Sequence, residues 1–255
     1  MAQFSKWHGL GNDFVLVDAI AGGELISPDE AIRVCDRHRG VGADGVLTLL
    51  PSEGAAARLH IYNPDGSVPE MCGNGARCAA RHLFEKTGRA EVVLETSAGP
   101  RRCEARGDDV RVDMGAPTVR PSRERVDVGR ILEVRRVSMG NPHAVVFVSE
   151  PVAPLAQELG PGIEKVFAGG VNVEFARRGP DGFIVSVWER GAGLTEACGT
   201  GACAVAAAAV AEGLVPAGVP VRIHLPGGTL TVEVAADGSR VWMTGPAVRV
   251  FAGSW

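Results

Sequence analysis

Residues 72–76 read Cys-Gly-Asn-Gly-Ala and residues 198–202 read Cys-Gly-Thr-Gly-Ala, so the same five-residue frame occurs twice, 126 positions apart. An aromatic residue stands ten positions before each cysteine, Tyr62 in the first copy and Trp188 in the second. Looser landmarks repeat on both sides, namely Gly-Asn at 11–12 and 140–141, and residues 114–117 and 243–246. Chance repetition of a glycine-rich stretch would not bring matching flanks, so the sequence predicts an internal duplication.

Short segments rich in β-branched residues, bounded by Gly, Pro or Asp, predict five strands in each half. These segments are residues 14–17, 46–50, 58–62, 91–94 and 110–114, then 144–148, 171–175, 183–187, 219–224 and 230–234. A capping box at residues 27–30 opens a predicted helix through about His38, and helical runs at 76–86 and 202–212 follow the two cysteine motifs.

The expected fold class is therefore α+β, with two similar domains in which a curled, mostly antiparallel sheet surrounds a central helix. Residues 1–116 form the expected first domain, which carries Cys72, and residues 117–255 form the second, which carries Cys198. The last residues of the chain are candidates to pack back on the first domain. The active site is expected in the cleft between the domains.

Composition excludes several classes of protein. The 255 residues include 26 Lys+Arg against 30 Asp+Glu, a net charge of −4 without the basic footprint of a nucleic-acid-binding protein. The longest apolar stretch, residues 202–211, is half the ~20 residues of a membrane span, and residues 1–7 show no export signal. We therefore expect a cytoplasmic protein whose cysteines stay reduced.

The six cysteines do not have the spacing of a metal site. Cys72 and Cys78 are six positions apart, and Cys198 and Cys203 are five apart, with no C-x2-C or H-x3-H pair beside them. Neither a metal nor a cofactor is expected. Buried packing is the commoner fate of a cysteine, and it suits those without a repeat partner: Cys35, Cys78, Cys103 and Cys203.

Cys72 and Cys198 each stand immediately before a Gly-x-Gly that opens a predicted helix. The first turn of a helix has unpaired N–H groups and partial positive charge, which should lower a thiol pKa from ~8.5 toward neutrality and seat a carboxylate. Two such ends facing one carbon would suit two-base proton transfer. A thiolate removes the α-proton of an amino acid from one face while a thiol delivers a proton to the other, and the centre is inverted.

Seven stretches closely resemble diaminopimelate epimerase, a family of cofactor-independent amino-acid epimerases. They are residues 6–14, 40–45, 63–67, 71–77, 140–143, 172–173 and 188–201. The resemblance implies interconversion of LL- and meso-diaminopimelate, on the route to lysine and peptidoglycan precursors, by a homodimer without a cofactor. The shorter Cys-Gly-x-Gly pieces are also similar to proline racemase and related enzymes.

The resemblance also implies roles for individual residues. Cys72 and Cys198 would be the two acid/base thiols, and the amides of Gly73, Asn74, Gly199 and Thr200 would hold the reacting carboxylate. His143 and Glu189 would tune the pKa values of the cysteines. The remaining substrate contacts would come from Asn12, Asn63, Asn141, Asn172, Glu189 and Arg190, with the Arg190 fork on the far carboxylate. Taken alone, the asparagines are also typical turn residues, His143 a structural histidine, and Glu189 with Arg190 a solvated ion pair.

One position departs from the family pattern. Many members carry a Gln after Gly-x-Gly-x-Asp, where it helps to line the substrate pocket, but this chain has Gly45. Asp44, another neighbour or water would have to take its place. Two other functions stay open on sequence grounds: a two-cysteine racemase for a different amino acid, and a thiol redox or ligand-binding protein in which the cysteine pair forms a disulfide.

Overall fold

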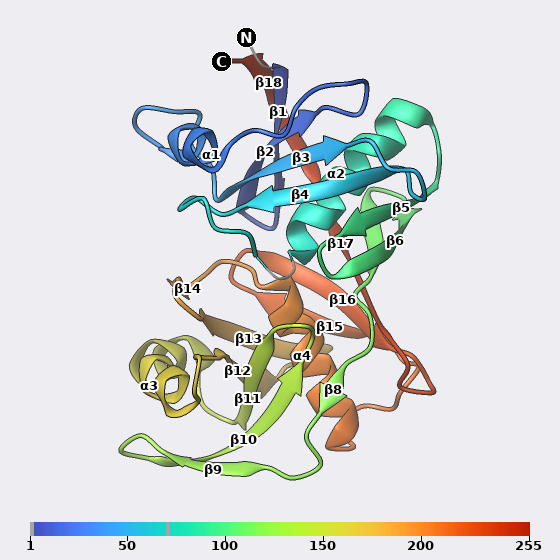
Figure 1. Ribbon diagram of the computed structural model, residues 1–255. Helices are drawn as coiled ribbons and strands as arrows, with labels where there is room; N and C mark the ends of the chain where they lie inside the picture. The colour runs from blue at the N-terminus through green and yellow to red at the C-terminus, as the bar shows by residue number, and fades with distance from the viewer. Residues whose placement is uncertain (1–2, 70–71) are drawn as a thin grey trace. The chain divides into compact units, whose positions relative to one another are not determined.

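The computed structural model describes residues 3–69 and 72–255, which form two compact units (Figure 1). Unit 1 contains the described residues up to Val112 together with Thr244–Trp255, and unit 2 is Asp113–Met243. Glu70 and Met71, which belong to the repeat and to the family motif, lie outside the described residues. No helix among the described residues is long and apolar enough to cross a membrane.

Unit 1 is a sheet in which neighbouring strands pair in the order β18-β1-β2-β3-β4-β5-β6-β7. The pairs β2–β3 and β4–β5 are parallel and the other pairs are antiparallel. Helix α1 (Pro28–Cys35) follows β2 and helix α2 (Gly73–Thr87) follows β4. The strands are β1 (Gln3–Gly9), β2 (Asn12–Asp18), β3 (Gly45–Leu50), β4 (Ala57–Tyr62), β5 (Glu91–Thr96), β6 (Gly99–Arg106), β7 (Asp109–Asp113) and β18 (Val248–Ser254).

Unit 2 pairs its main strands in the order β10-β11-β12-β13-β15-β16. The bounds are β10 (Ile131–Ser138), β11 (Pro142–Val148), β12 (Asn172–Arg178), β13 (Gly182–Glu189), β15 (Val221–Leu225) and β16 (Gly228–Val234). Helix α3 (Val152–Val166) follows β11 and helix α4 (Gly199–Ala211) follows β13. Smaller strands of the unit are β8 (Thr118–Val119), β9 (Glu124–Asp127) and β14 (Gly193–Leu194). Strand β17 (Val241–Pro246) begins in unit 2 and ends in unit 1.

The two units repeat one topology. From β1 to β6 the successive pairings are antiparallel, parallel, antiparallel, parallel and antiparallel. From β10 to β16 they follow the same series, and each parallel step encloses a helix in both units. The expected fold class, duplicated α+β domains with mostly antiparallel sheets around a central helix, is confirmed.

The central helices α2 and α4 show why the sheets can wrap around them. Helix α4 is almost entirely buried from Gly199 to Ala209, and its alanines let strands β10, β11, β12, β15 and β16 approach closely. Helix α2 contacts β1 to β6 and has a solvent-facing end that includes Glu85 and Lys86. Each central helix therefore has its N-terminus fixed by the surrounding sheet.

Several element boundaries differ from the predictions. Helices α2 and α4 begin at Gly73 and Gly199, three residues earlier than expected, because the cysteines themselves cap them. Helix α1 ends at Cys35 rather than near His38, because the Asp36 side chain accepts hydrogen bonds from the next amides instead. Helix α3 was not predicted, since its sequence contains Pro154, Gly160 and Pro161.

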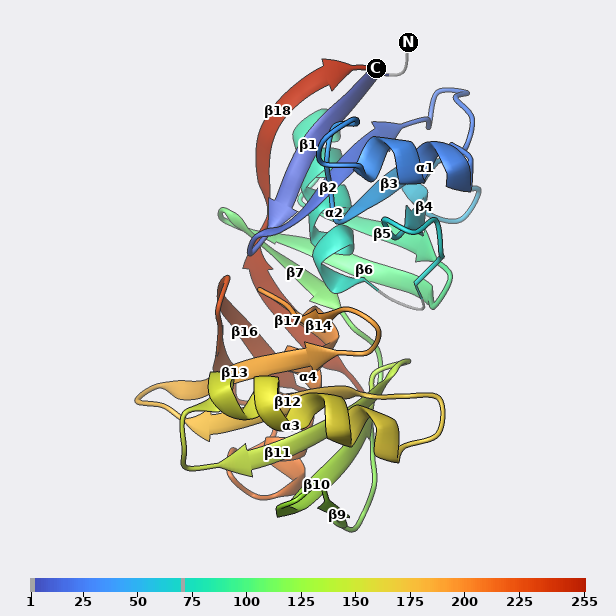
Figure 2. The ribbon, with the colours of Figure 1, turned by 90° about the vertical axis from the view of Figure 1, so that its left-hand side faces the viewer.

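Strands β1, β6, β10 and β18 were also not predicted from their local patterns. Strand β18 changes the domain boundaries, because it pairs antiparallel with β1 from Gln3–Ser254 to His8–Val248 (Figure 2). The second unit therefore does not run to residue 255, and the boundary between the units lies after Val112 rather than after residue 116. The end of the chain belongs to unit 1 because β18 pairs with β1.

Truncation of the chain after Ala247 tests this boundary. The change removes the strand that pairs with β1. It also removes the rings of Phe251 and Trp255, whose centroids lie 5.9 and 5.2 Å from the centroid of the Phe4 ring. Amide exchange in β1 should accelerate by about tenfold or more, since each tenfold corresponds to ~1.4 kcal/mol of local stability. Amides of β12 in unit 2 are the internal control. Unchanged exchange in β1 would show that β18 does not stabilise unit 1.

Candidate active site

Each repeated cysteine caps its own helix. Cys72 precedes α2 with φ −138° and ψ 97°, and its Sγ accepts a hydrogen bond from the Gly75 amide at 3.3 Å. Cys198 precedes α4 with φ −112° and ψ 107°, and its Sγ accepts from the Gly201 amide at 3.4 Å. The sulfur therefore occupies the place that a Ser or Asp oxygen takes in an ordinary N-cap.

The second glycine of each motif is required by this cap. A Cβ on Gly75 would lie 3.3 Å from the Cys72 sulfur and 2.9 Å from a Leu47 methyl carbon. A Cβ on Gly201 would lie 3.2 Å from the Cys198 sulfur and 2.9 Å from Glu174 Oε1. Only glycine allows the third residue of the helix to lie this close to the sulfur. The second glycine of Cys-Gly-x-Gly is therefore explained by the hydrogen bond that its amide donates to the cysteine three positions earlier.

The same cap leaves specific donors at the start of each helix. The first intrahelical bonds run from Ala76 to the Cys72 carbonyl and from Ala202 to the Cys198 carbonyl, both 3.0 Å long. In α4 the amides of Gly199 and Thr200 precede these bonds and have no acceptor within the helix. Gly73 and Asn74 occupy the corresponding positions in α2. The start of α4 therefore presents N–H groups of the kind that can bind a carboxylate.

Cys198 is buried, and its environment reverses the expected effect of the helix terminus. Burial raises the pKa of the Cys198 thiol well above its ordinary value, and the Glu189 and Glu174 carboxylates raise it further. Hydrogen bonds from the Thr200 hydroxyl and the Gly201 amide lower it only in part. The expectation of a pKa near neutrality is therefore wrong for Cys198, which carries its proton at neutral pH.

Glu189 lies at the end of β13 and contacts this thiol. Its Oε1 accepts a hydrogen bond from the Thr195 hydroxyl at 2.5 Å. Burial raises the pKa of Glu189, while hydrogen bonds from Thr195 and Cys198 oppose the change. Glu189 is therefore a half-buried carboxyl group directed at Cys198.

A second set of polar side chains lies behind Cys198, at the starts of β11 and β12. His143 Nδ1 lies 2.6 Å from Glu174 Oε1, and both side chains are fully buried. His143 Nε2 lies 3.0 Å from Asn141 Oδ1, and Asn141 Nδ2 donates to the Thr200 hydroxyl at 3.3 Å. The Thr200 hydroxyl is 3.6 Å from the Cys198 sulfur. His143 therefore reaches the thiol through two intervening side chains.

Arg190 lies in a turn that two unpredicted contacts hold. Asn172 Oδ1 accepts from the Arg190 amide at 2.9 Å, while Asn172 Nδ2 donates to the Pro142 carbonyl at 3.1 Å. Glu164 on α3 accepts from the Trp188 indole at 2.7 Å and from the Gly191 amide at 3.2 Å. One carboxylate thus bridges both sides of Arg190, whose side chain is exposed.

In unit 1 the asparagines form a chain next to Cys72. Asn74 Nδ2 donates to Asn12 Oδ1 at 3.1 Å, and Asn12 Nδ2 donates to Asp44 Oδ2 at 3.1 Å. Arg37 bridges Asp44 and Asp13, each at 2.7 Å. Burial alone would raise the pKa of Asp13, but hydrogen bonds from Arg37 and Lys6 lower it to about 2. The side-chain amide of Asn12 is therefore oriented by the cluster of Asp44, Arg37 and Asp13.

Asn63 lies in a turn at the end of β4. Its side chain donates to Ser67 Oγ at 2.9 Å, and its amide donates to the Ser67 carbonyl at 2.8 Å. This is the local turn chemistry that an asparagine next to a proline predicts. The turn places Asn63 on the chain segment that leads to Cys72.

The structure explains the glycine at position 45. Gly45 begins β3 and pairs with Phe14, and a Cβ there would lie 2.7 Å from the Tyr62 carbonyl oxygen. A glutamine cannot enter without a shift of β4. Asp44, which precedes it, hydrogen-bonds Asn12 and the Asp13 amide. The departure from the family pattern is thus built into the strand packing of unit 1.

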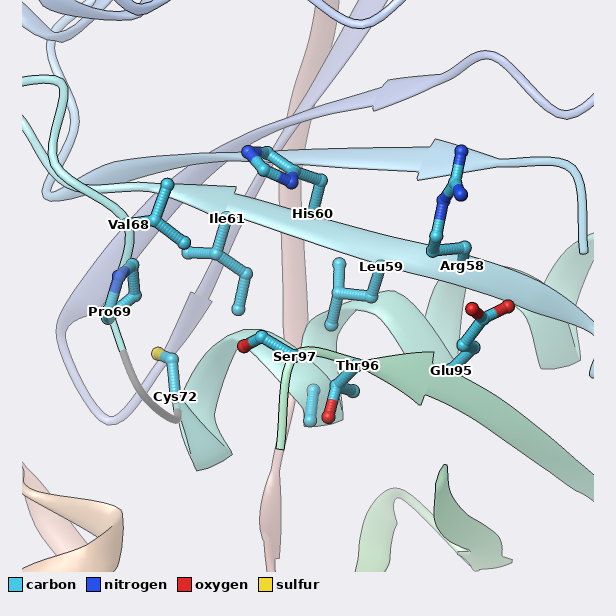
Figure 3. Close-up of a pocket in the computed structure, with 11 residues that line it drawn as sticks. Arg58, Leu59, His60, Ile61, Val68, Pro69, Cys72, Glu95, Thr96 and Ser97 are labelled. Atoms are coloured by element: carbon cyan, nitrogen blue, oxygen red, sulfur yellow. The ribbon is translucent and has the colours of Figure 1, made fainter. Parts of the chain in front are cut away.

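A pocket of about 240 Å³ in unit 1 opens onto Cys72 (Figure 3). Strands β4 and β5 pair only at Ala57–Leu94 and Arg58–Glu95. Beyond these pairs the strands diverge, and Figure 3 shows Cys72 at one end of the resulting wedge with Arg58 and Glu95 at the other. The half-buried Cys72 thiol is therefore reachable by water from within unit 1, in contrast to Cys198.

Four cysteines lie in the cores of the units, as expected of packing residues. Burial raises the pKa of Cys35 to about 11 and that of Cys78 to about 12. Cys103 and Cys203 are fully buried. No group of three or more His, Cys, Asp or Glu side chains suited to a metal occurs among the residues that the structure describes.

Sequence reasoning named Asp44 as a possible replacement for the missing glutamine but missed three other side chains of the candidate site. Glu164, Glu174 and Thr195 each hydrogen-bond a residue or turn of that site. Glu174 had a signal, since it lies two residues after Asn172 on one face of a strand. Glu164 had none, because its helix was not predicted.

The family model for diaminopimelate epimerase matches residues 4–120 and 135–250. A diaminopimelate epimerase of Cyanothece is 44% identical over 277 residues and covers 98% of both chains. That of Synechococcus elongatus is 46% identical over 277 residues, with 99% of this chain and 97% of the relative covered. This chain belongs to the diaminopimelate epimerase family.

Solved structures of more distant proteins share the fold of this family member. A hydroxyproline epimerase from Agrobacterium vitis superposes with a TM-score of 0.76 at 20% identity, over 99% of this chain and 91% of the other. A phenazine biosynthesis protein from Bacillus anthracis has a TM-score of 0.75 at 16% identity, over 99% and 98%. The duplicated architecture is therefore wider than the family.

Substitution of Gly201 by Ala tests the thiol cap. The new Cβ would collide with Glu174 Oε1 and crowd the Cys198 sulfur, so unfolding should require about 1–3 kcal/mol less free energy. Gly75→Ala should behave similarly in unit 1. Gly54→Ala is the control, since nothing lies within 4 Å of its Cβ position. Denaturant titration measures the difference, and a Gly201→Ala protein as stable as the control would contradict the geometry.

Proposed function

We propose that the protein is a cofactor-independent diaminopimelate epimerase that interconverts the LL and meso isomers of 2,6-diaminopimelate. In a member of this family, the observation that carries the proposal is the sulfur-capped helix that occurs once in each unit. The reaction serves lysine biosynthesis and the supply of peptidoglycan precursors. A racemase for another amino acid would share the thiols but would not need a residue for a second carboxylate.

Cys72 and Cys198 are the proposed acid/base pair. Cys198 is buried beside two carboxylates and holds its proton, so it starts as the acid in the free enzyme. When Cys198 is the acid, the isomer that reacts is the one whose α-proton faces Cys72. The Cys72 thiolate removes this proton while Cys198 protonates the opposite face of the α-carbon. The product leaves with the two protonation states exchanged, and the enzyme is then ready for the reverse isomer.

Backbone amides are the proposed source of carbanion stabilisation. Negative charge develops on the α-carboxylate when the α-proton leaves, and the first-turn amides of α2 and α4 are rigid donors for it. These are the amides of Gly73, Asn74, Gly199 and Thr200. Because the donors belong to helix starts held by buried sheets, they need no reorganisation during the reaction.

The far end of the substrate is assigned to Arg190 and to the amide side chains. A guanidinium can bind the distal carboxylate with two parallel hydrogen bonds. Glu164 and Asn172 hold the turn on which Arg190 stands. The amides of Asn12, Asn63 and Asn141 are the candidates for the amino groups and the remaining carboxylate oxygens. Glu189 is the proposed residue that tunes the pKa of Cys198, and His143 acts on Cys198 more remotely.

Cytoplasmic location and a homodimer complete the proposal. The mechanism needs both thiols reduced, which the cytoplasm maintains. Strand β18 supports a dimer, since it pairs with β1 and leaves Val248, Val250 and Phe251 45%, 57% and 47% exposed. Apolar side chains on an outer strand are suited to burial against a second copy.

Turnover in heavy water tests the two-base mechanism. The enzyme is given pure LL-diaminopimelate, a reductant and no cofactor. Because the delivering thiol has exchanged with solvent, early product should carry one deuterium at the inverted carbon, while recovered substrate stays largely unlabelled. Cys72→Ala and Cys198→Ala should each abolish inversion in both directions. Equal label in recovered substrate and product, measured by mass spectrometry at low conversion, would refute the assignment.

Arg190→Lys tests the recognition of the far carboxylate. Lysine keeps the charge but loses the planar pair of donors, so kcat/KM should fall by about tenfold or more, with part of the loss in kcat. Arg222→Lys is the matched control, because Arg222 is an exposed arginine of the same unit that pairs with Asp181. Wild-type kinetics for Arg190→Lys would remove this residue from the site.

A further inference from the structure

The loop that carries Arg190 is packed on helix α3. Arg190 lies between β13 and β14, next to Trp188 in the sequence of β13. Trp188 sits directly on Gly160 of α3, where a Cβ would lie 2.6 Å from Trp188 Cβ and 2.7 Å from Trp188 Cγ. The Arg190 amide donates to Asn172, as described above. These contacts fix the backbone at Arg190, so the direction of its side chain depends on what the side chain itself meets.

The Arg190 side chain lies against a glycine turn that follows α3. The turn is closed by a hydrogen bond of 2.9 Å from the Gly170 amide to the Phe167 carbonyl. A Cβ on Gly170 would lie 2.9 Å from Arg190 Cδ and 3.0 Å from Arg190 Cγ. Arg190 Nη1 also donates to the Gly169 carbonyl at 3.4 Å. The methylene groups of Arg190 therefore occupy the space that a side chain at position 170 would fill.

Backbone conformation alone does not distinguish Gly170 from other glycines of unit 2. Gly170 has φ +74°, Gly169 has φ +81°, and Gly213 at the end of α4 has φ +69°. All three conformations favour glycine over residues with a Cβ. For Gly169 and Gly213, however, no described atom beyond the adjoining residues lies within 4 Å of the Cβ position. The contact with Arg190 can therefore be separated from backbone strain.

We propose that Gly170 is a positioning residue whose lack of a side chain seats the Arg190 methylene groups and so holds the guanidinium where the far carboxylate of the substrate binds. That Arg190 binds this carboxylate rests on the proposed function, whereas the seat of its side chain does not. A side chain that is held in advance loses less conformational freedom on binding. The seat therefore favours substrates whose second carboxylate lies at one distance from the reacting carbon.

The structure indicates which group would move if position 170 gained a Cβ. The Arg190 side chain is exposed, so its methylene groups can turn away. The other neighbour, Glu164 Oε1, would lie 3.6 Å from the new Cβ, which is an ordinary contact. Gly170→Ala should therefore displace the guanidinium and leave the loop on α3 in place. Its loss of stability to denaturant should match that of Gly213→Ala, which adds similar backbone strain.

Steady-state kinetics with diaminopimelate test the consequence in the full-length protein. Gly170→Ala should lower kcat/KM by about tenfold or more, the equilibrium factor of one hydrogen bond to a charged group. The loss should divide between kcat and KM as it does in Arg190→Lys, whereas Gly169→Ala and Gly213→Ala should remain close to the wild type. Equal losses in Gly170→Ala and Gly169→Ala would overturn the proposal, because strain in the turn would then explain both.

Nitrogen-15 NMR of arginine-labelled protein without substrate measures the seat directly. The Arg190 Nε resonance, identified by its loss in Arg190→Lys, should shift in Gly170→Ala more than in Gly169→Ala, and it should not shift in Gly213→Ala. An unshifted resonance in Gly170→Ala would overturn the proposal. If the wild type does not convert diaminopimelate, the proposed function fails, while this measurement still decides whether Gly170 seats Arg190.

Asparagine variants keep the proposal falsifiable if Gly170→Ala does not fold. Asparagine adopts a positive φ more readily than alanine, but its Cβ meets Arg190 in the same way. Gly170→Asn should lose as much kcat/KM as expected for Gly170→Ala, with Gly169→Asn as its control. In an Arg190→Ala background, which lacks Cγ and Cδ, Gly170→Asn should cause no further loss than Gly169→Asn. A further loss there would show that position 170 acts without Arg190 and would contradict the assignment.

Discussion

A thiol that accepts a hydrogen bond from the third residue of its own helix is the interaction on which the candidate site depends. The bond places the sulfur of Cys72 over the start of α2 and that of Cys198 over the start of α4. It requires glycine at positions 75 and 201, because a Cβ would touch the sulfur. In α4 it also leaves the Gly199 and Thr200 amides without an acceptor inside the helix, so one short motif positions both the proposed acid/base group and the proposed carboxylate donors.

Duplication provides this interaction twice, but the surroundings differ between the copies. Cys72 is half-buried at the end of a pocket, next to asparagines oriented by an Asp–Arg cluster. Cys198 is buried beside Glu189 and is linked to a buried His–Glu pair. Burial and the two carboxylates outweigh the helix terminus at Cys198, so this thiol holds its proton. In the proposed two-base reaction, Cys198 is therefore the thiol that starts as the acid.

Carboxylates from neighbouring elements hold the polar side chains in place. Glu164 on α3 spans the turn that carries Arg190, Asp44 fixes the amide of Asn12, and Glu174 faces His143. None of these side chains belongs to the Cys-Gly-x-Gly motif. These carboxylates contact residues that are proposed to bind the substrate or to tune Cys198. Their substitution is expected to change the positions of those residues more than the charge next to the substrate.

The sequence by itself determined the duplication, the fold class and the two cysteines, because these depend on local patterns and on spacing along the chain. It also indicated the starts of helices α1, α2 and α4 to within three residues. Only the tertiary structure decided where unit 1 ends, since the residues of β18 pair with residues of β1 that lie at least 240 positions earlier. It alone decided the protonation of Cys198, because burial and the charges of Glu174 and Glu189 reach that thiol from separate strands. The contacts of Gly45, Glu164 and Glu174 likewise depend on packing between distant segments, which no local pattern encodes.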